Sequence, residues 1–163
     1  MMRKWSERTE EVRNLMNPAF CGRILFSAVA EYKRKTKHAL PFPLVFLILP
    51  LVLPRRIREK VNSKTKLINW TQKNQELIYN FDQIARDLVE ITKEALEFML
   101  QTGYLKITDS GEIDYNHVAE KISKTKYTDI EVKNCLLTAE SVARWFSSTN
   151  KVEMIYFCFG VRP

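Results

Sequence analysis

Four prolines in and around the most apolar segment of the chain restrict what it can fold into. Residues 44–53 are almost wholly apolar and contain Pro50, with Pro41, Pro43 and Pro54 at the flanks. Proline fixes φ and lacks a backbone N–H, which excludes a long helix and a central strand. A membrane span needs about 20 apolar residues, so neither a transmembrane segment nor a membrane partner is expected. We predict a short buried helix and then an extended turn. The segment would fill the core, the simpler interpretation, or form a docking surface.

Length and composition fit one globular domain. A chain of 163 residues can bury a core without disulfide bonds or metal ions. We divide it into a charged N-terminal segment, residues 1–16, and a single domain, residues 17–163. Cys21, Cys135 and Cys158 lie far apart in apolar stretches, which predicts buried thiols in a reducing compartment. The charged start does not resemble a secretion signal, so a cytoplasmic location is expected.

Apolar side chains recur every three to four residues in three segments, which predicts three main helices. The first begins at Asn17 and Pro18, with Asn17 as the N-cap, and ends in the basic run 33–37. The second is the longest helical pattern, over residues 75–101, which would be one long helix if it is unbroken. The third follows the capping box that starts at Thr128, and its apolar face ends at Phe146.

Two alternating runs around a glycine predict a β-hairpin. Residues 104–108 and 112–115 flank the turn that contains Gly111. A helix that leads into a hairpin is the layout of a winged helix-turn-helix. Residues 152–159, mostly apolar, are predicted to form a final strand. The expected fold class is therefore α+β, mainly helical: a winged-helix-like domain with a β-hairpin wing and a C-terminal strand.

Positive charge is concentrated in the first part of the chain. Residues 1–66 carry 15 Lys and Arg against 5 Asp and Glu, whereas residues 67–163 carry 11 against 14. Solvated helix faces or an acidic protein partner would account for this asymmetry as well as DNA would. Asp109 and Glu112 make the predicted wing tip acidic, which favours protein contact over DNA. The candidates for DNA phosphate contacts are Arg55, Arg56, Arg58, Lys60, Lys64 and Lys66.

Reactive side chains are few and scattered. His38 and His117 have no cysteine or acid nearby at the spacing of metal ligands. There is no glycine-rich phosphate loop, and Cys135 falls on the apolar stripe of its helix. The glutamates of the long helix lack a second acidic element with which to form a catalytic pair. We predict that the protein is not an enzyme and uses no metal ion or cofactor.

Five motifs in a fixed order resemble one family of bacterial proteins. They are Asn17-Pro18-Ala19-Phe20, residues 43–53, Thr92-Lys93-Glu94-Ala95-Leu96, Arg144-Trp145-Phe146, and Ile155-Tyr156 with Gly160-Val161-Arg162-Pro163. Together they resemble the middle component of three-component ABC-ATPase systems, the Lamassu-type anti-phage defence systems. The resemblance implies a non-enzymatic subunit that acts much as a kleisin does. It would bridge an SMC-like or Rad50-like ABC ATPase and an effector, often a nuclease, with DNA contacted through the complex.

The resemblance directs the search for partner contacts to the apolar run and the C-terminal tail. Without it, the C-terminal run would be interpreted as the last strand of the domain's own sheet, with residues 160–163 holding it in place. A DNA-binding winged-helix regulator is the alternative function, and non-specific DNA contact inside a complex is compatible with both. The predicted partner-binding residues are Leu44, Phe46, Leu47, Leu51, Leu53, Trp145, Tyr156, Gly160, Val161, Arg162 and Pro163.

Overall fold

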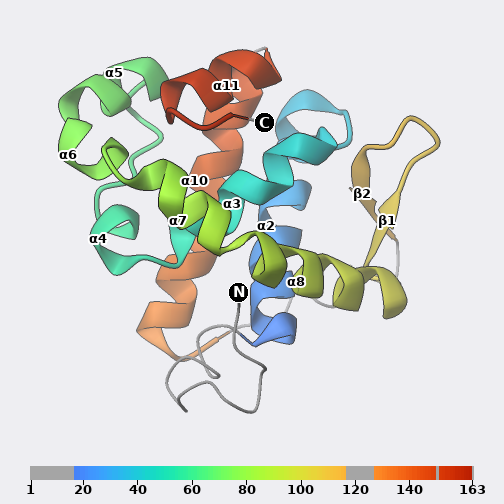
Figure 1. Ribbon diagram of the computed structural model, residues 1–163. Coiled ribbons are helices and arrows are strands. Elements are labelled where there is room, and N and C mark those ends of the chain that lie inside the picture. Colours follow the sequence, from blue (N-terminus) through green and yellow to red (C-terminus); the bar gives the residue numbers. More distant parts are fainter. Residues whose placement is uncertain (1–16, 117–126, 150, 163) are drawn as a thin grey trace.

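The computed structural model describes residues 17–116, 127–149 and 151–162 (Figure 1). These residues form a mainly helical α+β domain, as predicted. No helix among them is long and apolar enough to cross a membrane. The elements are α2 (Pro18–Thr36), η2 (Phe42–Leu44), α3 (Val45–Val52), α4 (Arg55–Arg58), α5 (Leu67–Lys73), α6 (Gln75–Ile78), α7 (Phe81–Asp87), α8 (Val89–Gln101), β1 (Leu105–Ile107), β2 (Ile113–Tyr115), α10 (Ile130–Ser148) and α11 (Val152–Cys158).

Helix α2 is the centre of the domain and packs on both α10 and α8 (Figure 1). It begins as predicted, because the Asn17 side chain accepts a hydrogen bond from the Ala19 amide at 2.7 Å. Gly22 allows the close approach of α8, since a Cβ there would lie 2.6 Å from the Cγ of Met99. The core-facing side of α2 includes Cys21, which is fully buried.

The proline-flanked segment fills the core. It forms the single turn η2 and the short helix α3, which contacts α2, α7, α8 and α10. Leu44, Leu47 and Leu51 are at most 1% exposed, so the simpler of the two interpretations is confirmed for them. Burial of each leucine side chain contributes about 2 kcal/mol to the hydrophobic stabilisation of the fold. Pro50 lies inside α3 and lacks a backbone N–H, so the helix forgoes the hydrogen bond from residue 50 to the carbonyl four residues earlier.

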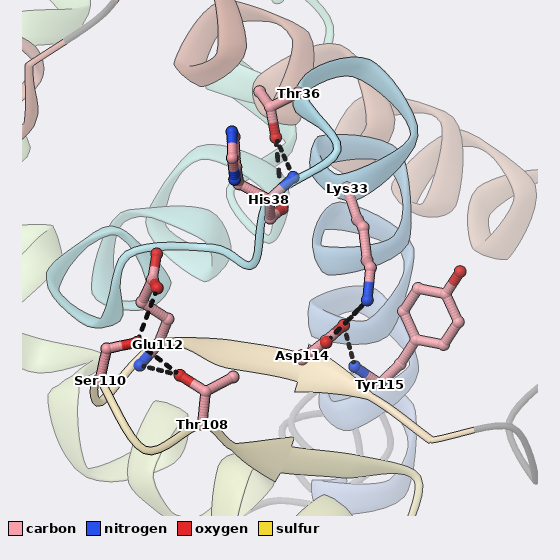
Figure 2. Close-up of polar contacts among 8 residues, drawn as sticks. All are labelled: Lys33, Thr36, His38, Thr108, Ser110, Glu112, Asp114 and Tyr115. Carbon is pink, nitrogen blue, oxygen red and sulfur yellow. Dashed lines mark hydrogen bonds and ion pairs between the residues drawn. The ribbon is translucent and has the colours of Figure 1, made fainter.

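The predicted hairpin is confirmed as the antiparallel pair β1–β2, with Leu105 opposite Tyr115. Its turn contains Gly111 at φ 81°, a conformation that favours glycine. Figure 2 shows how the hairpin is attached to α2: the Lys33 ammonium donates to both Asp114 carboxylate oxygens at 2.7 and 2.8 Å. Lys33, the first residue of the basic run at the end of α2, therefore makes an ion pair within the domain. The helix–hairpin order is present, and the winged-helix assignment remains a prediction.

The helical pattern over residues 75–101 is confirmed, but it is broken into three helices and is not one long helix. The chain bends at Asn80 (φ −113°, ψ 14°) and at Leu88 (φ −98°, ψ 2°), which separates α6, α7 and α8. The bends allow one apolar stripe to wrap around a curved core. Phe81, at the first bend, packs against Phe159 with ring centroids 5.1 Å apart. Tertiary packing therefore overrides a helical periodicity that continues through the bends.

The predicted C-terminal strand is also wrong, because residues 152–158 form helix α11. A short apolar run can be either strand or helix, and its exposure pattern decides between them. Ile155 and Phe159, four residues apart, are buried, whereas Met154 and Phe157 are exposed. That spacing is helical. A smaller correction concerns α10, whose N-cap is Asp129 and not Thr128: the Asp129 carboxylate accepts the Val132 amide at 3.0 Å.

Candidate partner-binding groove

The C-terminal tail is held in place by the end of α11. The Val161 amide donates to the Tyr156 carbonyl at 3.1 Å, and the Gly160 amide donates to the Phe157 carbonyl at 3.0 Å. Gly160 has φ 66°, so the three features together form a Schellman motif. This motif explains why glycine precedes the last residues, and it turns Val161 back toward the helix.

A groove of about 230 Å³ lies where this tail meets α3, α7 and the start of α8. It brings together five of the predicted partner-binding residues from segments more than 100 residues apart, of which Leu47 is fully buried and forms the floor behind the others. We call it the C-terminal groove, and its lining is mostly apolar: Phe46, Leu47, Ala85, Val89, Tyr156 and Val161, together with Arg86 and Arg162.

Tyr156 fixes one wall of the C-terminal groove. Its hydroxyl donates a hydrogen bond to the Pro43 carbonyl in the turn that precedes α3. Burial raises the pKa of Tyr156 to about 12, so the phenol is neutral at physiological pH and keeps this donor. Phe46 packs edge-on against Phe42 at 5.7 Å between ring centroids. These contacts hold the tail and the proline-flanked segment in one arrangement.

Two arginines give the C-terminal groove a positive side. Arg86 is paired with Asp82 at 2.5 Å, so its charge is partly compensated. Arg162 is exposed and has no ion pair within the described part of the chain. Both also line an adjacent hollow of about 330 Å³ that includes Gly160. An apolar lining beside a guanidinium without an ion pair among the described residues suits an apolar side chain followed by a carboxylate.

The other predicted partner-binding residues lie elsewhere. Leu44 and Leu51 are core residues, and Leu53 is half-buried. Trp145 is 1% exposed, so its side chain is an internal contact and not an external one. Pro163 lies outside the described residues.

Trp145 instead supports the basic loop between α4 and α5. Its indole N–H donates to the Thr65 carbonyl at 2.9 Å, and the Trp70 indole donates to the Lys60 carbonyl at 2.6 Å. The two rings lie 4.9 Å apart. A third contact comes from Arg144, whose Nε donates to the Ser63 hydroxyl at 3.2 Å. The loop is therefore held by contacts from α5 and α10.

The predicted DNA-contact residues fall into two groups. Lys60, Lys64 and Lys66 are exposed on this supported loop, and Arg55 and Arg56 are exposed on α4. Arg58 is a correction, since its side chain is only 7% exposed. Its guanidinium donates to the Val52 and Leu53 carbonyls at 2.8 Å and pairs with Glu131 at 2.8 Å. Arg58 is a structural link between the end of α3 and the start of α10, unavailable to a phosphate.

An exposed apolar face on α5 and α11 was missed by the sequence analysis. Ile68 is 51% exposed, Met154 is 48% exposed and Phe157 is 80% exposed. The run that contains Met154 and Phe157 was assigned to a strand, and a strand gives a different set of outward residues. Helical periodicity from Ile155 to Phe159 is the signal that could have identified this face.

The titratable side chains inside the domain are buried or held in ion pairs. Burial raises the pKa of the Cys135 thiol, which disfavours the nucleophilic thiolate. Burial and the nearby Glu31 carboxylate raise the pKa of Glu140. Glu31 itself is paired with Arg34 at 2.5 Å and with Arg144 at 3.7 Å. In the parts of the chain that are described, no three His, Cys, Asp or Glu residues are grouped as metal ligands would be.

One comparison with known proteins identifies the family. The model of the ABC-three component (ABC-3C) system Middle Component 3 matches residues 5–163, which is nearly the whole chain. No curated protein and no solved structure matches the sequence. The chain belongs to the Middle Component 3 family of ABC-three component systems.

Proposed function

We propose that the protein is a non-enzymatic scaffold subunit that bridges the ABC-type ATPase and the effector of its three-component system. The system would act in anti-phage or anti-plasmid defence, with an SMC-like or Rad50-like ATPase, and the bridging would resemble that of a kleisin. Membership of a middle-component family supports a role beside partner subunits. Burial raises the pKa of the Cys135 thiol, which disfavours this one residue as a nucleophile.

The observation that carries this proposal is the C-terminal groove. It gathers Phe46 of α3 and Tyr156, Val161 and Arg162 of the C-terminal part of the chain into one mostly apolar hollow, where Arg162 has no ion pair with a described residue. Apolar hollows with few polar groups are typical binding sites, and aromatic and arginine side chains contribute most to protein–protein contacts. Since the walls are fixed by the Tyr156 hydrogen bond and the Schellman motif, a partner would meet a preformed surface.

The test is reconstitution of the three components with and without this chain. We expect the ATPase and the effector to co-purify only when the chain is present, with stoichiometry measured by size-exclusion chromatography and light scattering. Arg162→Glu should weaken retention of one component by about tenfold or more. Lys35→Glu, an exposed charge reversal on α2, is the matched control. Association of the ATPase and the effector without the chain would refute the bridging role, as would recovery of the chain alone.

A DNA-binding regulator is the second candidate, and the supported basic loop favours it. Lys60, Lys64 and Lys66 project from a loop held by two tryptophans, so phosphate contacts would need little ordering. The test is the salt dependence of DNA affinity. Lys-to-Glu changes at these three positions should flatten the slope of log affinity against log salt by about 0.9 per lost contact. An unchanged slope would exclude the loop as the DNA contact.

A further inference from the structure

We infer that the face formed by α5 and α11 is a second docking surface, and that it binds an acidic, amphipathic segment of another component of the system. We call it the α5–α11 surface and define it by Lys66, Ile68, Met154, Phe157 and Cys158. The inference rests on the proposed scaffold function, because a bridging subunit needs two separate contacts.

Exposure of apolar side chains is the first support. Phe157 is 80% exposed, although its neighbours Ile155, Tyr156 and Phe159 are at most 5% exposed. Ile68, on the neighbouring helix α5, is 51% exposed. A groove of about 310 Å³ between the two helices includes Ile68, Met154 and Cys158 in its lining. Large apolar side chains gathered around a hollow are typical of a protein-binding face.

Helix geometry separates this surface from the C-terminal groove. Met154 and Cys158, four residues apart, share the side of α11 that faces α5. Tyr156 lies about 160° to 200° further round a helix with 100° per residue, and it lines the C-terminal groove instead. Helix α11 therefore lies between two hollows, close to α5 at one edge of the molecule (Figure 1). Two partners could be held by one short helix.

Charge on the α5–α11 surface selects the class of partner. Lys66 lines the groove, and Lys64 and Lys151 lie in the segments that precede α5 and α11; all three are exposed. None of the three forms an ion pair with a residue in the described ranges. Lysines beside exposed apolar residues complement a helix with acidic and apolar faces. Duplex DNA would use the lysines but leave Phe157 and Met154 without a partner.

The position of the one acid on α11 refines the arrangement. Glu153 lies one turn before Phe157 and is exposed. At 100° per residue, Glu153 is about 100° from Met154 and about 140° from Cys158, which face Lys66, but only about 40° from Phe157, so it borders the Phe157 edge of the surface. Positive charge therefore borders the α5 side of the surface, and the acidic residues of the partner would lie there. Reversal of the charge at Lys66 should weaken binding of an acidic partner, whereas reversal of the charge at Glu153 should not.

The experiment uses the full chain, co-expressed with the other two components, and measures how much of each is retained on the tagged chain. Phe157→Asp and Lys66→Glu should lower retention of one component by about tenfold or more, while the other component stays bound. Glu153→Lys should retain at least as much as the unmodified chain. Ile130→Asp is the matched control, since Ile130 is 74% exposed at the far end of α10. Circular dichroism and thermal unfolding of each variant exclude loss of fold.

Each result decides a different claim. Loss with Phe157→Asp and Lys66→Glu, but not with Ile130→Asp, supports the α5–α11 surface. Full retention of both components by the first two variants overturns this surface and leaves the scaffold function standing. Absence of both components from the unmodified chain overturns both. Affinity for a 30-base-pair duplex that falls with Lys66→Glu but not with Phe157→Asp, with both components still bound, shows a DNA surface and overturns the inference.

Discussion

Replacement of Arg58 by alanine should destabilise the domain strongly, although the residue belongs to a basic run that looks solvent-exposed in the sequence. Its guanidinium donates to the carbonyls of Val52 and Leu53, where α3 ends, and pairs with Glu131 of α10. A hydrogen bond from a charged donor contributes about 1.5–3 kcal/mol. The Glu131 side chain is 56% exposed, so this ion pair adds at most about 1 kcal/mol.

The three contacts share one guanidinium and are not additive, so the expected loss is about 3 kcal/mol of unfolding free energy. In a domain of 163 residues this lowers the melting temperature by about 6–12 °C. The assay is equilibrium urea unfolding followed by the fluorescence of the buried Trp70 and Trp145. The unfolding free energy of Arg58→Lys should lie between those of the unmodified protein and Arg58→Ala, because lysine keeps the charge but loses the planar guanidinium.

Arg55→Ala is the matched control for Arg58. Arg55 lies one turn earlier on α4 and is exposed, with an ion pair to Glu59 at 2.7 Å. Its removal should leave the unfolding midpoint close to that of the unmodified protein, because exposed pairs contribute little. Equal midpoints for Arg58→Ala and Arg55→Ala would refute the structural role of Arg58 and restore it as a candidate for phosphate contact.

Three further predictions concern the tail, the hairpin and the basic loop. Gly160→Ala should cost about 1–2 kcal/mol in thermal unfolding, because φ is 66° and a Cβ would meet no atom within 4 Å, so the cost is conformational; an unchanged melting temperature would contradict the Schellman assignment. Burial alone would raise the pKa of Asp114, but hydrogen bonds from Lys33 and the Tyr115 amide outweigh it and lower the pKa below its usual value. The ionised carboxylate therefore stabilises the fold above the unfolded-state pKa, and this stability is lost as the pH falls through the lowered folded-state pKa. In urea unfolding from pH 6 to pH 3, the unfolding free energy should decline less for Asp114→Asn than for the unmodified protein. Trp145→Phe removes the donor to the Thr65 carbonyl, so it should lower the unfolding free energy by about 1 kcal/mol and speed amide hydrogen exchange in the loop around Thr65. Equal exchange rates in the variant and the unmodified protein would show that this hydrogen bond does not hold the loop.

Helix α11 explains why the C-terminal tail drew attention in the sequence and why its role was only partly predicted. Six consecutive apolar residues must be covered, and the structure covers Ile155, Tyr156 and Phe159 inside the domain. Met154 and Phe157 remain outside. The tail is therefore the last element of its own fold and also, in our proposal, the support for two partner contacts.

Local patterns in the sequence are enough to predict several features of the fold. The Asn17 cap, the short helix in the proline-flanked segment, the hairpin around Gly111 and the mainly helical class depend on neighbours within a few residues. The family motifs also include five residues of the C-terminal groove. Local backbone preferences and capping act at short range, so they can be seen without the fold.

Other features were decided only by tertiary structure. The bends at Asn80 and Leu88, the helical form of the last apolar run, and the burial of Arg58 and Trp145 all depend on contacts between distant segments. Arg58 is the clearest case: its charge predicts a solvated surface, yet the carbonyls at the end of α3 and the Glu131 carboxylate surround it. Helical and extended forms of a short apolar run differ little in local free energy. Long-range packing therefore selects between them, and with that choice it determines which side chains reach a partner.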